Sequence, residues 1–202
     1  IISCMYDYYI SYLESYKDKL VGIGLPIDIS NEKTEPNIKK NKIKIFIGVQ
    51  KERTSWKGTD RIISELSTLF QQTEFSQNFE LTIAENLPYQ EYIQRYNDTN
   101  IFIDQLYSYS SGMNGLNALA KGKIVFGGAE PVADNTFYDT PSPIKNISPL
   151  NIDRIKDMLL PYAEDKDTLI QQESKNATDF VKKYHNSDNI AQQYVNNYLE
   201  LL

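Results

Sequence analysis

Three basic residues lie close together in the segment "GVQKERTSWKGTD", residues 48–60. Lys51, Arg53 and Lys57 follow an apolar run and precede an amphipathic one, so we expect them between the end of a strand and the beginning of a helix. A helix N-terminus has unpaired N–H groups and a partial positive charge. With an arginine and two lysines beside it, such a loop is suited to bind a diphosphate. The alternative is a solvated basic loop without a ligand.

Two acidic residues stand where other apolar runs end. Asp104 closes "NIFID", and Glu130 follows Gly127 and Gly128 in "FGGAEP". The glycines would let a ligand approach the backbone closely. We expect Asp104 to face the crevice at the strand ends, with a helix-capping or turn role as the alternative. Glu130 could contact a sugar or ribose, or be an exposed loop residue.

The elements that must position these residues follow from the hydrophobic pattern. Short apolar runs alternate with amphipathic ones, which indicates an α/β fold with a mostly parallel sheet flanked by helices. The predicted strands are 43–49, 79–85, 100–104, 123–128 and 144–148. The predicted helices are 5–19, 59–71 (capped by Thr59 or Asp60), 88–98, 113–121 with Gly122 as its C-cap, one from 151 or 153 that Pro161 interrupts, 164–184 and 188–201.

In such a fold, ligands bind beyond the carboxyl ends of the strands. The loops that follow the predicted strands therefore hold the candidate site. These loops are 49–58, 85–88, 104–112 and 127–135.

Composition narrows the classes of function. The 202 residues carry a net charge of −6, which argues against nucleic-acid binding. Cys4 is the only cysteine, so no intramolecular disulfide can form, and we expect a cytoplasmic, reducing location. A histidine-based metal site or catalytic triad would rest on His185 alone, which we expect at the surface or at a helix end. Neither zinc-ligand spacing nor a membrane-spanning apolar run occurs, and we expect no metal.

The basic loop and the later segment together resemble a known family. The chain resembles, over residues 20–202, the carboxy-terminal half of a GT-B glycosyltransferase of the "glycosyl transferases group 1" type. The first loop has Arg and Lys ahead of a Gly in "RTSWKGTD". The later segment has the strand end "FID", then Gly112, "NALA" and "GKIV".

The resemblance implies a Rossmann-like domain that binds a nucleotide-sugar donor, without a metal or any further cofactor. Arg53 and Lys57 would neutralise the leaving diphosphate, and Glu130 would take over a sugar or ribose contact. Asp104 would also orient the Gly112 loop. The positions implied to bind the donor are Gly48, Gly58, Asp104, Tyr109, Gly112 and Asn117.

The sequence departs from the family pattern at three places. Many retaining members have two glutamates eight positions apart, and the matching residues here are Tyr109 and Asn117. Asn117 can still hydrogen bond to a ribose hydroxyl as a neutral group, whereas Tyr109 cannot act as a carboxylate. The family arginine usually follows the strand-end glycine directly, but Val49 follows Gly48. These departures leave the stereochemistry of transfer open.

The predicted organisation has three parts. Residues 1–37 would be the tail of an amino-terminal domain plus a linker, 38–185 the donor-binding domain, and 186–202 a helix that packs back toward the absent domain. The predicted function is donor binding in a bacterial glycosyltransferase that acts on a polysaccharide or a lipid-linked sugar. The absent domain would carry the acceptor site and any peripheral membrane contact, so residues 1–202 alone should be inactive.

Three other functions stay open. A degenerate, non-catalytic sugar-nucleotide-binding or assembly module would fit the missing glutamates. A sugar-nucleotide epimerase of similar architecture would need more acid–base residues than the chain readily supplies. A flavodoxin- or receiver-like signalling domain would place clustered acids after the first strand, where the loop is basic instead.

Overall fold

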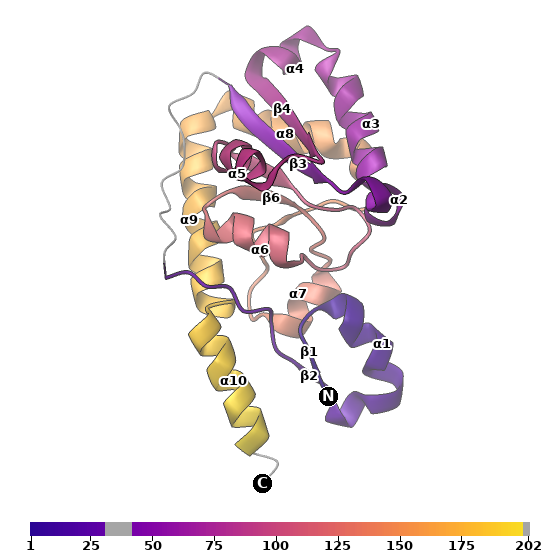
Figure 1. Ribbon diagram of the computed structural model, residues 1–202, viewed down its shortest axis with the longest axis vertical. Coiled ribbons are helices and arrows are strands. Elements are labelled where there is room, and N and C mark those ends of the chain that lie inside the picture. Colours follow the sequence, from indigo (N-terminus) through magenta and orange to yellow (C-terminus); the bar gives the residue numbers. More distant parts are fainter. Residues whose placement is uncertain (31–41, 200–202) are drawn as a thin grey trace.

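A five-stranded, entirely parallel sheet forms the centre of the protein, seen in a computed structural model that describes residues 1–30 and 42–199. The strand order is β4-β3-β5-β6-β7, and Figure 1 labels β3, β4 and β6 of this sheet. The strands are β3 (Ile43–Val49), β4 (Phe79–Glu85), β5 (Ile101–Ile103), β6 (Ile124–Gly127) and β7 (Lys145–Asn146). The predicted α/β class is therefore confirmed, and each predicted strand overlaps an observed one.

Helices follow almost every strand. After β3 and β4 come η2 (Lys51–Arg53), α2 (Thr54–Lys57), α3 (Thr59–Phe70), α4 (Thr73–Asn78) and α5 (Tyr89–Asn97). After β5, β6 and β7 come α6 (Met113–Ala120), α7 (Pro131–Phe137), η3 (Ile152–Arg154), α8 (Ile155–Glu164), α9 (Lys166–Tyr184) and α10 (Ser187–Leu199).

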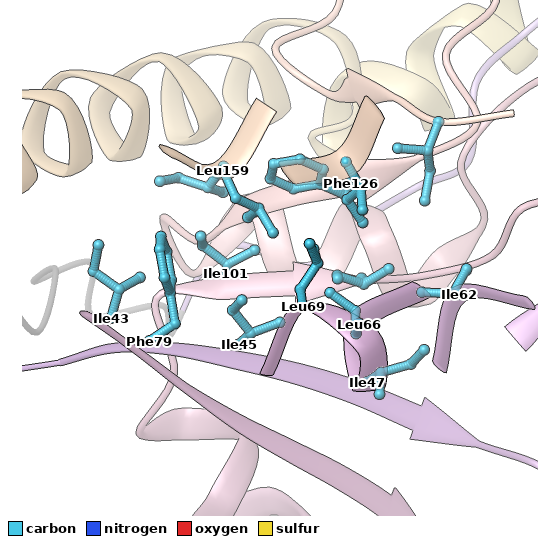
Figure 2. Close-up of a cluster of buried hydrophobic side chains, with 14 of the residues drawn as sticks. Ile43, Ile45, Ile47, Ile62, Leu66, Leu69, Phe79, Ile101, Phe126 and Leu159 are labelled. Carbon is cyan, nitrogen blue, oxygen red and sulfur yellow. The ribbon is translucent and has the colours of Figure 1, made fainter. Parts of the chain in front are cut away.

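Alternation along β3 explains why the sheet is buried on both faces. Ile43, Ile45 and Ile47 belong to a core cluster with α3 and α8, and Figure 2 labels them together with Leu66 of α3 and Leu159 of α8. Phe46, between them, belongs to a second cluster with α5, α6 and α9. Successive side chains point to opposite faces of a strand, so an uninterrupted apolar run supplies both cores.

A smaller unit lies at the amino-terminal end, beside α7 (Figure 1). It consists of β1 (Ile2–Ser3), α1 (Tyr6–Tyr16), η1 (Lys17–Lys19) and β2 (Val21–Gly22), with β1 and β2 paired in parallel. The pattern predicted the helix but not the two-residue strands. The predicted boundary between residues 37 and 38 lies outside the described residues.

His185 joins the segment that follows this unit to the end of α9. Its Nδ1 lies 2.8 Å from the carbonyl oxygen of Leu25, and its Nε2 lies 3.0 Å from the hydroxyl of Tyr138. The ring is 1% exposed, so the expectation of a surface histidine is wrong, although His185 does follow the end of α9. Burial lowers the pKa of His185 to about 4.

Two local predictions about helices are also wrong. Pro161 lies inside α8, which continues to Glu164, because Leu159 and Tyr162 on either side of it are buried in the sheet cluster. The proline costs the helix one backbone hydrogen bond near its last turn. Neither Thr59 nor Asp60 caps α3, which begins directly after Gly58 without a side-chain cap. No described helix is long and apolar enough to cross a membrane.

Candidate functional site

The strand order creates a crevice at the carboxyl end of β3. β4 lies on one side of β3 and β5 on the other, so the chain leaves these neighbouring strand ends in opposite directions. Ligands of parallel α/β sheets bind at such a switch point. A pocket of about 730 Å³ opens there, lined by Gly48 and Val49 of β3 and by Asp104 just after β5.

Basic side chains form one wall of this pocket. Lys51, Arg53 and Lys57 line it, together with a single acid from the same segment, Glu52. The segment is not the open loop that the sequence suggested, because it winds into the short helical turns η2 and α2. The exposed Lys51 and Arg53 and the half-buried Lys57 are thus held on one short scaffold.

Gly58 ends this scaffold and packs it against the segment after β5. Its φ of 65° lies in the left-handed region, and a Cβ there would lie 2.8 Å from the Cβ of Leu106. The N–H of Leu106 also donates to the carbonyl oxygen of Lys57 at 2.7 Å. Gly58 does not line the pocket, so its observed place is behind the basic wall.

Asp104 lines the same pocket as the basic residues and is 6% exposed. Its carboxyl group accepts hydrogen bonds from the hydroxyl of Ser111, at 3.4 Å, and from the N–H of Gly112. Burial raises the pKa of Asp104, while the charge of Lys57 and these two hydrogen bonds act in the opposite direction. Desolvation is the largest of these effects, so the neutral form is favoured relative to an exposed aspartate.

Two tyrosine side chains of α5 also line the pocket. Tyr92 of α5 packs edge-on against Phe46 with ring centroids 5.1 Å apart, and a Cβ at Gly48 would lie 3.0 Å from its hydroxyl. The small residue at position 48 therefore makes room for this tyrosine. Tyr89, at the beginning of α5, also lines the pocket and is 76% exposed. Burial raises the pKa of Tyr92.

Asn117 lies in a second pocket of about 350 Å³. Tyr89, Tyr92, Phe102 and Asn114 line both pockets, so the two adjoin. The structure thus brings together five of the predicted residues: Gly48, Arg53, Lys57 and Asp104 in the first pocket, and Asn117 beside it.

Tyr109, Gly112 and Glu130 do not line either pocket. The N–H of Tyr109 donates to the carboxylate of Asp7 in α1 at 3.0 Å, and its ring packs edge-on against Tyr6. Gly112 precedes α6 in an extended conformation that any residue can adopt. Glu130 precedes α7, and its N–H donates to the carbonyl oxygen of Tyr109 at 2.9 Å.

The sequence did not identify several of the residues that line the pocket. The loop 85–88 was a candidate by its position, but Asn86 and Leu87 were not assigned to the site. Asn86 has a φ of 52°, a conformation that asparagine tolerates better than most residues. The pocket is also lined by helical residues, namely Tyr89 and Tyr92 of α5 and Asn114 of α6. Their position beside the strand ends follows from how the helices pack on the sheet, which the sequence pattern does not reveal.

The described residues contain no group of three or more histidine, cysteine, aspartate or glutamate side chains that could hold a metal ion. No protein-family model matches the sequence. A search of curated proteins also found no relative.

Similar solved structures exist despite low sequence identity. HepE from Anabaena, solved in complex with UDP-glucose, has a TM-score of 0.68 at 15% identity, covering 100% of this chain and 63% of its own. A glycosyltransferase from Rickettsia africae has a TM-score of 0.66 at 16% identity, covering 98% and 62%. TarM from S. aureus, in a complex that includes UDP, has a TM-score of 0.67 at 12% identity, covering 96% and 43%.

The chain therefore spans between 43 and 63% of the length of these three proteins. At such identities the likeness concerns the fold. The parallel sheet, its flanking helices and the full coverage of this chain agree with the resemblance drawn from the two motifs. The chain has the Rossmann-like α/β fold of GT-B glycosyltransferases, matched over part of their length.

Proposed function

We propose that this chain is the nucleotide-sugar-binding domain of a glycosyltransferase that transfers a sugar to a polysaccharide or a lipid-linked acceptor. The observation that carries the proposal is the pocket at the switch point of the sheet, with Lys51, Arg53 and Lys57 on one wall. Support also comes from HepE and TarM, which were solved with UDP-glucose and UDP.

Arg53 and Lys57 have the central roles in this proposal. The diphosphate of a nucleotide sugar carries two negative charges, and it gains more charge as its bond to the sugar breaks. Cationic side chains fixed beside that charge stabilise it most as it develops, which lowers the barrier to transfer. The short helical turns η2 and α2, closed by Gly58, carry both residues on one ordered stretch of backbone that lines the pocket.

The remaining lining suits the rest of a donor. Tyr89 and Tyr92 offer aromatic surface to a base or a sugar ring, and Asn114 and Asn117 offer neutral hydrogen-bonding groups to hydroxyls. The volume of about 730 Å³ lies within the range of small-molecule sites. Glu130 stays a candidate for the sugar contact only if the loop at 128–130 moves toward the pocket.

Calorimetric titration of this chain with a nucleoside diphosphate and with the matching nucleoside tests the proposal. A hydrogen bond to a charged group contributes about 1.5–3 kcal/mol, so Arg53→Ala and Lys57→Ala should each weaken diphosphate binding about tenfold or more. Nucleoside binding should stay unchanged. Arg53→Lys should also weaken diphosphate binding if the contact is bidentate.

Lys182→Ala, which removes an exposed lysine of α9 outside the pocket, is the matched control and should bind as the wild type does. Equal losses for the diphosphate and the nucleoside would show that the basic scaffold is only structural. Unchanged binding in both variants would place the phosphates elsewhere.

A non-catalytic binding module is the second candidate, and one observation favours it. Tyr109 stands where many related enzymes have a glutamate, and its backbone is tied to α1 instead of facing the pocket. This candidate predicts donor binding without sugar transfer or donor hydrolysis in any longer chain that contains these residues. Turnover by such a chain would exclude it.

A further inference from the structure

Asp104 has an unusual position for an acid in a site for anions. It lines the same pocket as Arg53 and Lys57, and the carboxyl group is almost completely withdrawn from solvent. An ionised carboxylate there would repel a diphosphate across a medium of low dielectric constant. The side chain is also expensive to keep charged, because burial of an ion costs free energy unless strong partners compensate.

Close packing fixes the carboxyl group in this place. A Cβ at Gly127 would lie 3.4 Å from the Cβ of Asp104, and a Cβ at Gly115 would lie 3.3 Å from its Oδ2 and overlap the Oγ of Ser111. The N–H of Asp104 donates to the carbonyl oxygen of Phe126 at 2.9 Å. The carboxyl group thus lies close to Gly127 of β6 and Gly115 of α6, which leave room for it.

We propose that Asp104 is held as a neutral carboxylic acid and donates a hydrogen bond from its hydroxyl to a phosphate oxygen of the donor. This inference rests on the proposed function. It makes Asp104 a donor-binding residue that recognises the diphosphate only while it carries a proton. Donor binding then becomes linked to that proton, and the bound diphosphate in turn stabilises the protonated form.

Among the described residues, the groups that face Asp104 include no second carboxyl group. They are Lys57 of α2, Tyr92 of α5, Ser111 and the N–H of Gly112. Lysine and tyrosine ordinarily titrate at about pH 10, and burial raises the pKa of Tyr92 further. Glu52 is the other carboxyl group that lines the pocket, and because it is exposed it serves as the control.

The test uses UDP-glucose, ADP-glucose and GDP-glucose, whose diphosphate diesters keep a constant charge between about pH 5.5 and 8. For a donor that binds, affinity should fall as the pH rises, by up to about tenfold per pH unit above the pKa of the acid. Asp104→Asn keeps a neutral N–H donor of nearly the same shape, so it should bind about as well as the wild type at low pH and show no such dependence.

Two further variants complete the comparison. Asp104→Ala loses the hydrogen bond and should bind about tenfold more weakly. Glu52→Gln should keep the wild-type pH profile. A flat wild-type profile, or a profile that Glu52→Gln abolishes, would overturn the inference.

A measurement without ligand separates this inference from the proposed function. If Asp104 is neutral in the folded chain, the free energy of unfolding of the wild type should fall relative to that of Asp104→Asn as the pH rises through the range where an exposed aspartate ionises and above it. Parallel curves would overturn the inference even if donors bind. If none of the three donors binds to the wild type at any pH, the proposed function fails, and this inference with it.

Discussion

The buried histidine makes the stability of this protein depend on pH in a predictable direction. The carbonyl oxygen of Leu25 can only accept, so Nδ1 of His185 must carry the proton, and Nε2 then accepts from the hydroxyl of Tyr138. Protonation of Nε2 would require the Tyr138 hydroxyl to accept instead of donate, and it would place a charge in a buried site. The neutral form is therefore the folded form.

The magnitude follows from the pKa of His185, which burial lowers from 6.5 to about 4. That difference corresponds to about 3 kcal/mol. Because the folded-state pKa is depressed, this contribution is fully present above pH 6.5 and is lost as the pH falls toward 4. A loss of this size is a large part of the stability of an ordinary domain.

Urea unfolding at pH values from 7.5 to 4, followed by far-ultraviolet circular dichroism, measures the effect. Other acids titrate over the same range, so the quantity of interest is the difference between the wild type and His185→Gln. Glutamine can donate to Leu25 and accept from Tyr138 but does not titrate. Between pH 7 and pH 4, the unfolding free energy of the wild type should fall by about 3 kcal/mol relative to that of His185→Gln. Two curves that stay parallel would refute the argument that the ring is neutral because it is buried.

Two further substitutions test how the basic wall and the segment at 108–110 are held. Gly58→Ala should destabilise the chain by about 1–3 kcal/mol in urea unfolding, because the new Cβ meets Leu106 at a φ of 65°; a change below about 0.5 kcal/mol would show that the turn relaxes freely. Asp7→Ala should speed amide hydrogen exchange at Tyr109 and Ser110, because their N–H groups donate to the carboxylate of Asp7. Asp18→Ala, in the neighbouring η1, is the control and should leave this exchange unchanged.

The sheet was largely predictable because its central strands β3, β5 and β6 consist mostly of buried apolar residues. Residues 43–49 and 79–85 were predicted as strands, and β3 and β4 have those same bounds. Both segments are seven residues long and rich in β-branched and aromatic side chains, a length and composition typical of strands rather than helices. The loops that carry Arg53, Lys57 and Asp104 then followed from the rule that ligands bind at the carboxyl ends of parallel strands.

Contacts between residues far apart in the sequence were not predictable in the same way. The carboxylate of Asp7 accepts hydrogen bonds from Tyr109 and Ser110, which lie about a hundred positions later. His185 contacts Leu25 from the opposite end of the chain. The residues next to Asp7 and His185 in the sequence do not indicate these partners. Only the tertiary packing brings the two side chains to their hydrogen-bonding groups.

The strand order alone does not separate a donor-binding domain from a flavodoxin- or receiver-like domain. Counted along the chain, the order is second, first, third, fourth, fifth, which flavodoxin-like sheets also have. The distinction comes from the residues at the shared crevice. Lys51, Arg53 and Lys57 follow the first strand of this sheet, whereas a signalling domain of that type would have clustered acids there. Of the two acids that line the pocket, Asp104 is favoured in its neutral form by burial, and the exposed Glu52 stands beside three cations, so the crevice as a whole is suited to an anion.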